Sequence, residues 1–252
     1  MEILGIDIGG SGVKAALVNT ETGELLTERY RVDTPQPAKF NALMETLEEM
    51  GEHFQWHGPV GCGFPGVIQK QEIRTAANLH KTLVGKRLGD ELAPFYGQSA
   101  RLINDADAAG LAEMRFGLGK DKSGLVLFLT IGTGIGTAMF LDGKLVPNSE
   151  FGHMTIPYGK DKFIKAEHYA ADSARKRDDL SWEEWAKRFN VFLEEICVLA
   201  NPDEVVVGGG VAKKGEKFME YIDSPCPLSL AKLQNRAGII GAALAAEQAL
   251  SV

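Results

Sequence analysis

The sequence predicts an α/β fold built from two related halves. One arrangement occurs twice: an apolar strand, a polar residue at its end, a glycine-rich turn and a second strand. It occupies residues 2–19 near the N-terminus and residues 125–141 near the midpoint. The other segments alternate between strand and helix patterns, which is typical of α/β proteins. With 252 residues, of which 44% are hydrophobic, the chain can bury the core of one large domain or two modest ones.

The individual elements follow from local patterns. The alanine-rich run 106–115 favours a helix. Ser181 and Glu184 form a capping box at the start of another helix. In the first half we expect strands over 2–8, 13–18 and 24–32, a helix near 38–54, a strand at 60–68 that breaks into a Pro-Gly turn, a short helix over 88–95, a strand at 100–103 and the helix 106–115. In the second half we expect a three-strand unit at 125–147, a helix over 181–199, a strand over 204–210 and a small-residue helix over 236–250.

The two glycine turns lead into strands and not into helices, which separates them from dinucleotide-binding and Walker-type loops. Residues 13–18 after the first turn are apolar and partly β-branched. The second strand after the other turn ends at Asp142-Gly143, a hairpin-turn dipeptide. Backbone N–H groups in such turns can face an anion, so the pair suggests a phosphate chain held between two domains. Either turn alone could simply shape its hairpin.

Composition argues against several function classes. The net charge of −7 argues against general nucleic-acid binding. No apolar run approaches the roughly 20 residues that cross a membrane, and the chain opens directly in a strand pattern, so we expect no signal peptide. Cys62, Cys197 and Cys226 are few, odd in number and far apart. We therefore expect reduced thiols, a cytoplasmic protein and no zinc site.

Three basic clusters stand out on this acidic chain. Each could be an ordinary solvated face, or could mark where a polyanion lies. The clusters are Lys160, Lys162 and Lys165; Arg175, Lys176 and Arg177; and Lys213, Lys214 and Lys217.

Polar side chains at strand ends are the candidates for chemistry. Asp7 ends a buried strand just before the first turn, where a carboxylate could reach Mg²⁺ or its waters, or could only cap the turn. Lys14 could approach phosphate or point to solvent. Asn104-Asp105 lies between a strand and a helix, where binding groups gather in α/β folds. Asp105 could be a general base for an attacking hydroxyl or a plain helix N-cap.

A second set follows the later hairpin. Glu150, His153 and Glu167 could hydrogen-bond neighbouring sugar hydroxyls, or could be a structural pairing of histidine with glutamate. Asn78 is a weak signal on its own.

Taken together, these stretches resemble the ROK family of sugar kinases, and within it the polyphosphate glucokinases. The resemblance covers nearly the whole chain in order. It is carried by residues 7–14, 64–66, 78–79, 102–113, 130–136, 145–153, 207–210 and 237–243. It implies the two-domain, ribonuclease H-like fold of hexokinase, actin and the heat-shock ATPases, with duplicated βββαβα units. The implied domains are 1–105 plus 238–252, and 106–237, with the active site in the cleft between them and the helices from Ala106 and Ala237 as the hinge.

The resemblance also implies roles for residues. Asp105 would be the catalytic base on the sugar 6-hydroxyl, and Asp7 would work through Mg²⁺. The sugar-binding set would be Gly66, Asn78, Asn104, Asp105, Glu150, His153 and Glu167. The phosphate- and nucleotide-binding set would be Asp7, Gly9, Gly10, Ser11, Gly12, Lys14, Thr130, Gly132, Thr133, Gly134, Gly208, Gly209 and Gly210.

Three features depart from the family pattern. Residues 154–177 contain no cysteine, so the zinc segment of many ROK proteins is missing and His153 is left for the sugar. The polyphosphate glucokinases share this absence. His80 and Leu83 stand where that subfamily usually has an acidic residue and tryptophan, and Phe151 stands where it usually has leucine.

The resemblance therefore implies a homodimeric enzyme that makes glucose 6-phosphate from glucose and polyphosphate, with ATP as a possible second donor. The cysteine content favours a cytoplasmic one. The rival kinase reading is an ATP-dependent ROK kinase for glucose or another hexose, such as mannose or an N-acetyl amino sugar. A sugar-sensing repressor would carry a DNA-binding segment ahead of the first strand. An actin-like ATPase would not need the sugar set.

Overall fold

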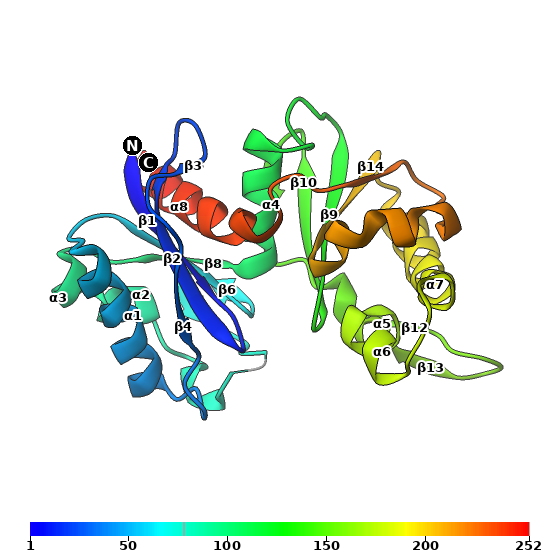
Figure 1. Cartoon of the computed structure of the whole chain (residues 1–252), viewed down its shortest axis with the longest axis horizontal. Coiled ribbons are helices and arrows are strands. Elements are labelled where there is room, and N and C mark those ends of the chain that lie inside the picture. The colour runs from blue at the N-terminus through cyan, green and yellow to red at the C-terminus, as the bar shows by residue number, and fades with distance from the viewer. Residues whose placement is uncertain (78, 252) are drawn as a thin grey trace. The chain divides into compact units, whose positions relative to one another are not determined.

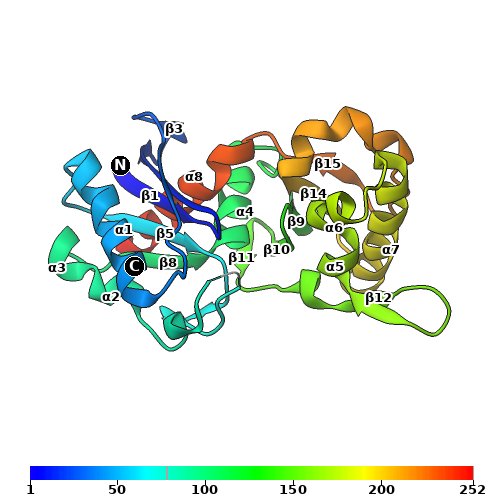
Figure 2. The same cartoon turned by 60° about the horizontal axis from the view of Figure 1, so that its bottom comes forward.

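The computed structural model describes residues 1–77 and 79–251. The chain divides into two units (Figures 1 and 2). Unit 1 contains Met1–Ala112 and Arg236–Val252, and unit 2 contains Glu113–Asn235. Asn78, one of the expected sugar-binding residues, lies outside the described residues.

Unit 1 is built on a mixed sheet in the order β3-β2-β1-β5-β8, with β4 also paired to β2. Its strands are β1 (Glu2–Ile8), β2 (Gly12–Asn19), β3 (Glu24–Leu25), β4 (Tyr30–Asp33), β5 (Val60–Phe64) and β8 (Arg101–Asn104). β1 and β2 form an antiparallel hairpin, while β5 and β8 continue parallel to β1. The strand expected at 24–32 is two short strands, because residues 26–29 leave the ladder.

Helices cover both faces of this sheet. Side chains of β1 alternate, so Leu4 and Ile6 join the cluster that includes Leu43 and Leu47 of α1 (Phe40–Phe54). Gly5 is on the opposite face, against α8 (Ala237–Leu250), which Figure 1 draws in red beside blue β1. A Cβ at Gly5 would overlap a carbonyl oxygen of α8. The prediction of a closely packed, small-residue helix is confirmed.

Unit 2 repeats the pattern of an antiparallel hairpin joined to a parallel strand. Its sheet has the order β11-β10-β9-β14-β15. The strands are β9 (Leu125–Ile131), β10 (Ile135–Leu141), β11 (Lys144–Val146), β14 (Glu204–Gly209) and β15 (Leu228–Leu230). β9 and β10 are antiparallel, and β14 runs parallel to β9. The predicted duplication of strand, turn and strand is therefore confirmed.

The core of unit 2 is aromatic. α7 (Trp182–Ala200) begins at the predicted Ser181–Glu184 capping box. Its buried Trp185 stacks on Phe189 with ring centroids 5.1 Å apart. The Trp185 ring N–H donates to the Ala170 carbonyl oxygen at 2.8 Å, so the buried polar atom has a partner.

The remaining elements are short, apart from α4. The segment expected as one helix at 88–95 is two, α2 (Leu88–Glu91) and α3 (Ala93–Tyr96). The others are α4 (Asp105–Phe116), α5 (Ala166–Ala170), α6 (Asp172–Arg177), β6 (Ile68–Gln69), β7 (Glu72–Ile73), β12 (Thr155–Pro157), β13 (Phe163–Lys165), and 3₁₀ turns at Lys81–Leu83, Phe151–His153, Gly210–Lys217, Met219–Tyr221 and Gln234–Arg236. None of the helices in the described part of the chain is long and apolar enough to span a bilayer.

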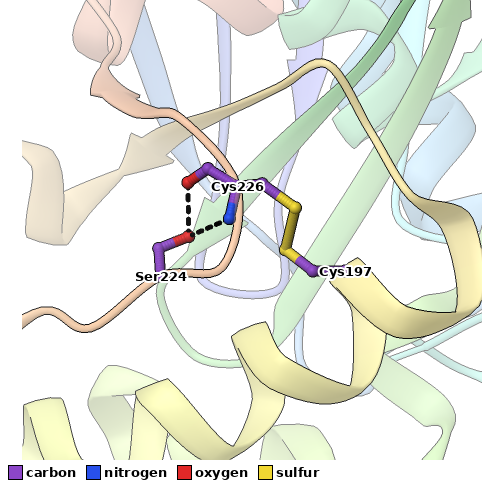
Figure 3. The surroundings of a disulfide bond; sticks show 3 residues. All are labelled: Cys197, Ser224 and Cys226. Atoms are coloured by element: carbon purple, nitrogen blue, oxygen red, sulfur yellow. Dashed lines mark hydrogen bonds between the residues drawn. A yellow bond between two sulfur atoms is a disulfide. The ribbon is translucent and has the colours of Figure 1, made fainter.

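One expectation from the sequence is wrong. Cys197 and Cys226 form a disulfide in unit 2, between the last turn of α7 and the segment before β15 (Figure 3). Their separation of 29 residues hid this pairing, because only the packing of α7 against the sheet brings their Cα atoms to 6.3 Å. Cys62 is a free, buried thiol, and burial raises its pKa to about 12.

Candidate active site

The first glycine turn joins β1 to β2 and is closed on itself. The Gly9 N–H donates to the Gly12 carbonyl oxygen at 3.1 Å. The other carbonyl oxygens of the turn accept bonds from side chains that follow in the chain. The Thr34 hydroxyl donates to Gly9 at 2.6 Å, and the Gln36 amide donates to Gly10 at 3.2 Å. Sequence reasoning missed these partners, since only the pairing of β4 with β2 brings them to the turn.

Asp7 and Lys14 lie directly opposite each other in the hairpin register. The Lys14 ammonium is 3.2 Å from the Asp7 carboxylate, and the two side chains are 34% and 21% exposed. A Cβ built on Gly238, at the start of α8, would be 3.0 Å from the Asp7 carboxyl carbon. The positive end of that helix therefore lies beside the carboxylate.

A magnesium ion fits this donor set. Asp7 is a single, half-buried carboxylate beside a glycine turn, and Mg²⁺ is commonly held by one or two carboxylates together with waters and substrate phosphates. Among the described residues, no group of three or more histidine, cysteine or acidic side chains could hold a metal ion by itself.

Asp105 begins α4 where β8 ends, two strands away from Asp7. Asp7 pairs with Gly63 of β5, and a Cβ on Gly63 would be 3.7 Å from the Asp105 Cα atom. Gly63 therefore lies between Asp7 and the start of α4, within van der Waals reach of the Asp105 backbone. Carboxyl ends of adjacent parallel strands are where ligands bind in α/β sheets.

The cap of α4 is Asn104. Its buried side-chain oxygen accepts from the N–H groups of Ala106 at 2.9 Å and Asp107 at 3.0 Å. Its side-chain NH₂ donates to the Gly66 carbonyl oxygen at 3.1 Å. Asn104 therefore ties the Gly66 turn to the start of α4. Both residues that the sequence offers as a cap take part, because an Asp105 carboxylate oxygen also accepts from the Ala106 N–H, at 2.8 Å.

The second glycine turn joins β9 to β10 in unit 2. The Gly132 N–H donates to the Gly134 carbonyl oxygen at 3.0 Å. Ser173 of α6 holds the other two carbonyls. Its N–H donates to Gly132 at 3.2 Å, and its hydroxyl donates to Thr133 at 2.6 Å. Ser173 is another residue that the sequence did not single out.

The predicted sugar set of unit 2 assembles beside this turn. The His153 ring lies between two carboxylates, with Nδ1 3.7 Å from Glu150 and Nε2 3.6 Å from Glu167. A Cβ on Gly134 would be 2.8 Å from a Glu167 oxygen. These separations exceed hydrogen-bond length, so the carboxylate oxygens keep capacity for sugar hydroxyls.

The surroundings of Glu150 change the pKa of its carboxyl group. Burial raises the pKa of its carboxyl; His153 opposes that rise, and the Glu167 carboxylate adds to it. The side chain is 27% exposed. The folded protein thus favours the protonated form of Glu150 more than the unfolded chain does.

The glycines at 208–210 lie next to the second turn. In the parallel register of β14 and β9, Gly208 is opposite Thr130 and Gly209 is opposite Ile131. Gly209 has a φ of +76°, a conformation that side chains other than glycine rarely adopt. The strand can therefore turn sharply beside the predicted phosphate site.

The basic clusters differ in their charge balance. Arg175 and Lys176 both pair with Asp172, and Arg177 pairs with Asp178. Burial would raise the pKa of Asp172, but hydrogen bonds from Lys176 and Arg175 outweigh it and the pKa is lowered. This cluster is an ion-pair network. The lysines of the other two clusters form no ion pair with any residue that the structure describes.

Comparisons with known proteins agree with this layout. The ROK family model matches residues 3–168. The polyphosphate glucokinase of Mycobacterium tuberculosis (strain H37Rv) is 43% identical over 242 residues, covering 96% of this chain and 89% of the relative. The crystal structure of an inorganic polyphosphate/ATP-glucomannokinase from Arthrobacter sp. strain KM has a TM-score of 0.91 at 40% identity, covering 100% of this chain and 99% of that one.

A more distant structure confirms the fold alone. A ROK family glucokinase from Streptomyces griseus, in complex with glucose and AMPPNP, has a TM-score of 0.82 at 23% identity, covering 98% of this chain and all of that one. The predicted fold of the hexokinase and actin type is confirmed. The chain is a member of the ROK family.

Proposed function

We propose that this chain transfers a phosphoryl group from polyphosphate to the 6-hydroxyl of glucose, with ATP as a second donor. The observation that carries this proposal is 43% identity to a polyphosphate glucokinase across 96% of the chain. The likeness to a polyphosphate/ATP-glucomannokinase over its full length supports the choice of donors.

Asp105 is the proposed general base. As the sugar oxygen attacks the terminal phosphorus, Asp105 takes the hydroxyl proton, and the donor leaves one phosphate shorter. The place of Asp105 at the first residue of α4, directly after β8, supports this role, because ligands bind at the carboxyl ends of strands in α/β sheets. Gly66, Asn78, Asn104, Glu150, His153 and Glu167 are proposed to hold the sugar.

The glycine turns are proposed to bind the donor. Gly9 to Gly12 and Thr130 to Gly134 would offer N–H groups to phosphate oxygens, with Gly208 to Gly210 beside the donor path. Asp7 would hold Mg²⁺ through water, and the ion would offset the charge of the donor phosphates. No zinc is needed in this scheme, and metal analysis of the purified protein should find none in stoichiometric amount.

A second candidate is an ATP-dependent kinase for another hexose. Its support is the group of more distant relatives, such as the N-acetyl-D-glucosamine kinase of Shigella flexneri, 32% identical over 164 residues. The pocket residues do not separate epimers, since one hydroxyl contact can change without altering the motif. Mannose and N-acetyl amino sugars therefore belong in the acceptor panel.

The deciding experiment is a paired kinase assay. Glucose and Mg²⁺ are supplied with either polyphosphate or ATP as the sole donor, and glucose 6-phosphate is measured. Strong product formation with polyphosphate supports the proposal. Product with ATP alone favours the second candidate, and no product from either donor with any hexose overturns both.

We also propose that the enzyme acts in the cytoplasm as a homodimer, without a nucleic-acid or membrane partner. The net charge of −7 supports the absence of a nucleic-acid partner. Light scattering on the eluting protein tests the dimer, since a mass near 27.3 kDa would mean a monomer.

A further inference from the structure

We infer that the segment from Arg31 to Gln36 is part of the donor site: Arg31 binds donor phosphate directly, while Thr34 and Gln36 position the first glycine turn. This inference rests on the proposed phosphoryl transfer. It concerns residues that lie outside every motif used to recognise the family.

The first step is the direction of the peptide groups in the turn. Three successive carbonyl oxygens are engaged by this segment, those of Gly9, Gly10 and Ser11. Thr34 is the anchor, because it is only 4% exposed, and its own N–H also donates to Ser11 at 3.4 Å. The carbonyls are thus drawn toward β4 and the residues that follow it.

As a consequence, two backbone N–H groups of the turn are left without a hydrogen-bond acceptor among the residues that the structure describes. Within the described part of the chain, the N–H groups of Gly10 and Ser11 have no hydrogen-bond partner. Ser11 is exposed and Gly10 half-buried, so neither N–H is shut away from solvent. Successive free N–H groups form a concave nest that attracts an anion. A turn free to rotate its peptides would lose this arrangement.

The second step concerns the guanidinium group of Arg31, which lies against the turn. Arg31 donates through Nη2 to the Ser11 carbonyl oxygen at 3.0 Å. A Cβ on Gly12 would be 2.7 Å from Arg31 Nε. The cation therefore lies against the turn itself, and the absence of a side chain at Gly12 gives it room.

Arg31 has capacity to bind phosphate. Its other contact is an ion pair from Nη1 to Asp33 at 2.6 Å, and the Asp33 side chain is 83% exposed. Exposed ion pairs of this kind contribute little to stability. A guanidinium carries five N–H donors and matches phosphate in a bidentate way. Lys14, by contrast, is engaged by the less exposed Asp7.

Arg87 provides a matched control. It also pairs with an exposed aspartate, Asp90, at 2.5 Å and donates to a backbone carbonyl oxygen, that of Lys70, at 2.7 Å. The Arg31 and Arg87 side chains are 49% and 50% exposed. Arg87→Gln therefore removes the same charge and the same kinds of contact away from the glycine turn.

The test compares Michaelis constants for donor and for glucose. Arg31→Gln should raise the KM for the donor about tenfold or more, as expected for a lost charged hydrogen bond, with the KM for glucose unchanged. Arg87→Gln should leave both constants at the wild-type level. Equal effects of the two variants, or an equal rise in the KM for glucose, would overturn the direct role of Arg31.

The positioning role has its own test. Thr34→Val removes the hydroxyl at constant shape and should lower kcat/KM for the donor several-fold, while Thr34→Ser should restore it. Circular dichroism checks that both variants fold. If Thr34→Val folds and keeps wild-type donor kinetics, or if Thr34→Ser fails to rescue, the positioning role is wrong.

Binding measured without turnover separates this inference from the proposed function. Calorimetry with tripolyphosphate should detect binding to the wild type and to Arg87→Gln, and at least tenfold weaker binding to Arg31→Gln. That pattern would support the site even if the wild type formed no sugar phosphate. Equal tripolyphosphate affinity in all three proteins would refute it.

Discussion

The two glycine turns have the same design but different surroundings. In each, the first N–H closes the turn on itself, and other carbonyl oxygens accept hydrogen bonds from a later segment of the chain. The first turn lies against the cation of Arg31, whereas the second lies against the carboxylate of Glu167. A duplicated hairpin has thus kept its backbone and changed its neighbours. The cation beside the first turn favours binding of donor phosphate there. The carboxylate beside the second turn favours a position where the donor meets the sugar.

The largest effect should come from Asp105, the proposed base, which follows β8 in the same sheet as the first turn. Asp105→Asn should lower kcat by about 10²–10⁴-fold, the range for a lost general base. Glucose binding should persist, because the proposed sugar-binding residues Glu150, His153 and Glu167 are unchanged. Calorimetry with glucose and a coupled assay measure the two effects. Asp90→Asn, another aspartate near a helix start, is the control, and near-normal turnover of Asp105→Asn would refute the assignment.

Breaking the disulfide should lower the stability of unit 2, which carries the second turn, without lowering that of unit 1. Cys197 and Cys226 close a loop of 29 residues in unit 2, which corresponds to about 3–4 kcal/mol of stabilisation in a chain-entropy estimate. Reduction, or Cys197→Ser, should lower the denaturation midpoint of unit 2 and leave that of unit 1. Cys62→Ser is the control. Finding three titratable thiols in the unreduced, denatured protein would contradict the pairing.

Loosening the second turn should affect both substrates. Ser173→Ala removes the hydroxyl bond to Thr133 and should lower kcat/KM for donor and for glucose roughly 5–10-fold, the equivalent of one hydrogen bond. Ser224→Ala is the control, because it also removes a hydroxyl bond to a carbonyl oxygen, at Cys226. An effect on the donor alone would mean that the two turns serve the same end of the reaction.

The smallest expected effect is on stability, at Glu150. Its folded-state pKa is raised, so its stabilising contribution is full below the unfolded-state pKa and is lost as pH rises through the folded-state pKa. Glu150→Gln imitates the protonated form. It should therefore be more stable than wild type at pH 7 and equal near pH 4, while its KM for glucose rises. Denaturant melts at the two pH values test this, and a constant difference would refute it.

The sequence allowed much of this to be predicted, because the glycine turns and strand ends are local features. Strand endings and spacing are enough to single out Asp7, Asp105 and the Glu150–His153 pair as candidates, and their roles stay predictions. Ser173 was not, because its role depends on α6 meeting a turn about 40 residues earlier. Local patterns do not report which distant side chain completes a backbone hydrogen bond.

The disulfide and the cap of α4 escaped prediction for similar reasons. Cysteine spacing gave no sign that Cys197 and Cys226 meet, since the contact is made by packing. Asn104 and Asp105 are adjacent and both suit an N-cap, so propensity could not choose between them. The choice depends on where the Gly66 turn lies, and that turn comes from β5 and the segment that follows it.

Asn104 also has a consequence for fidelity. One buried amide touches both the Gly66 turn and the first N–H groups of α4, so neither can shift without straining the other. A sugar with a wrong hydroxyl that pushed on the Gly66 turn would also displace the helix start that carries Asp105. The Asn104 side chain would then couple the fit of the substrate to the position of the residue that takes its proton.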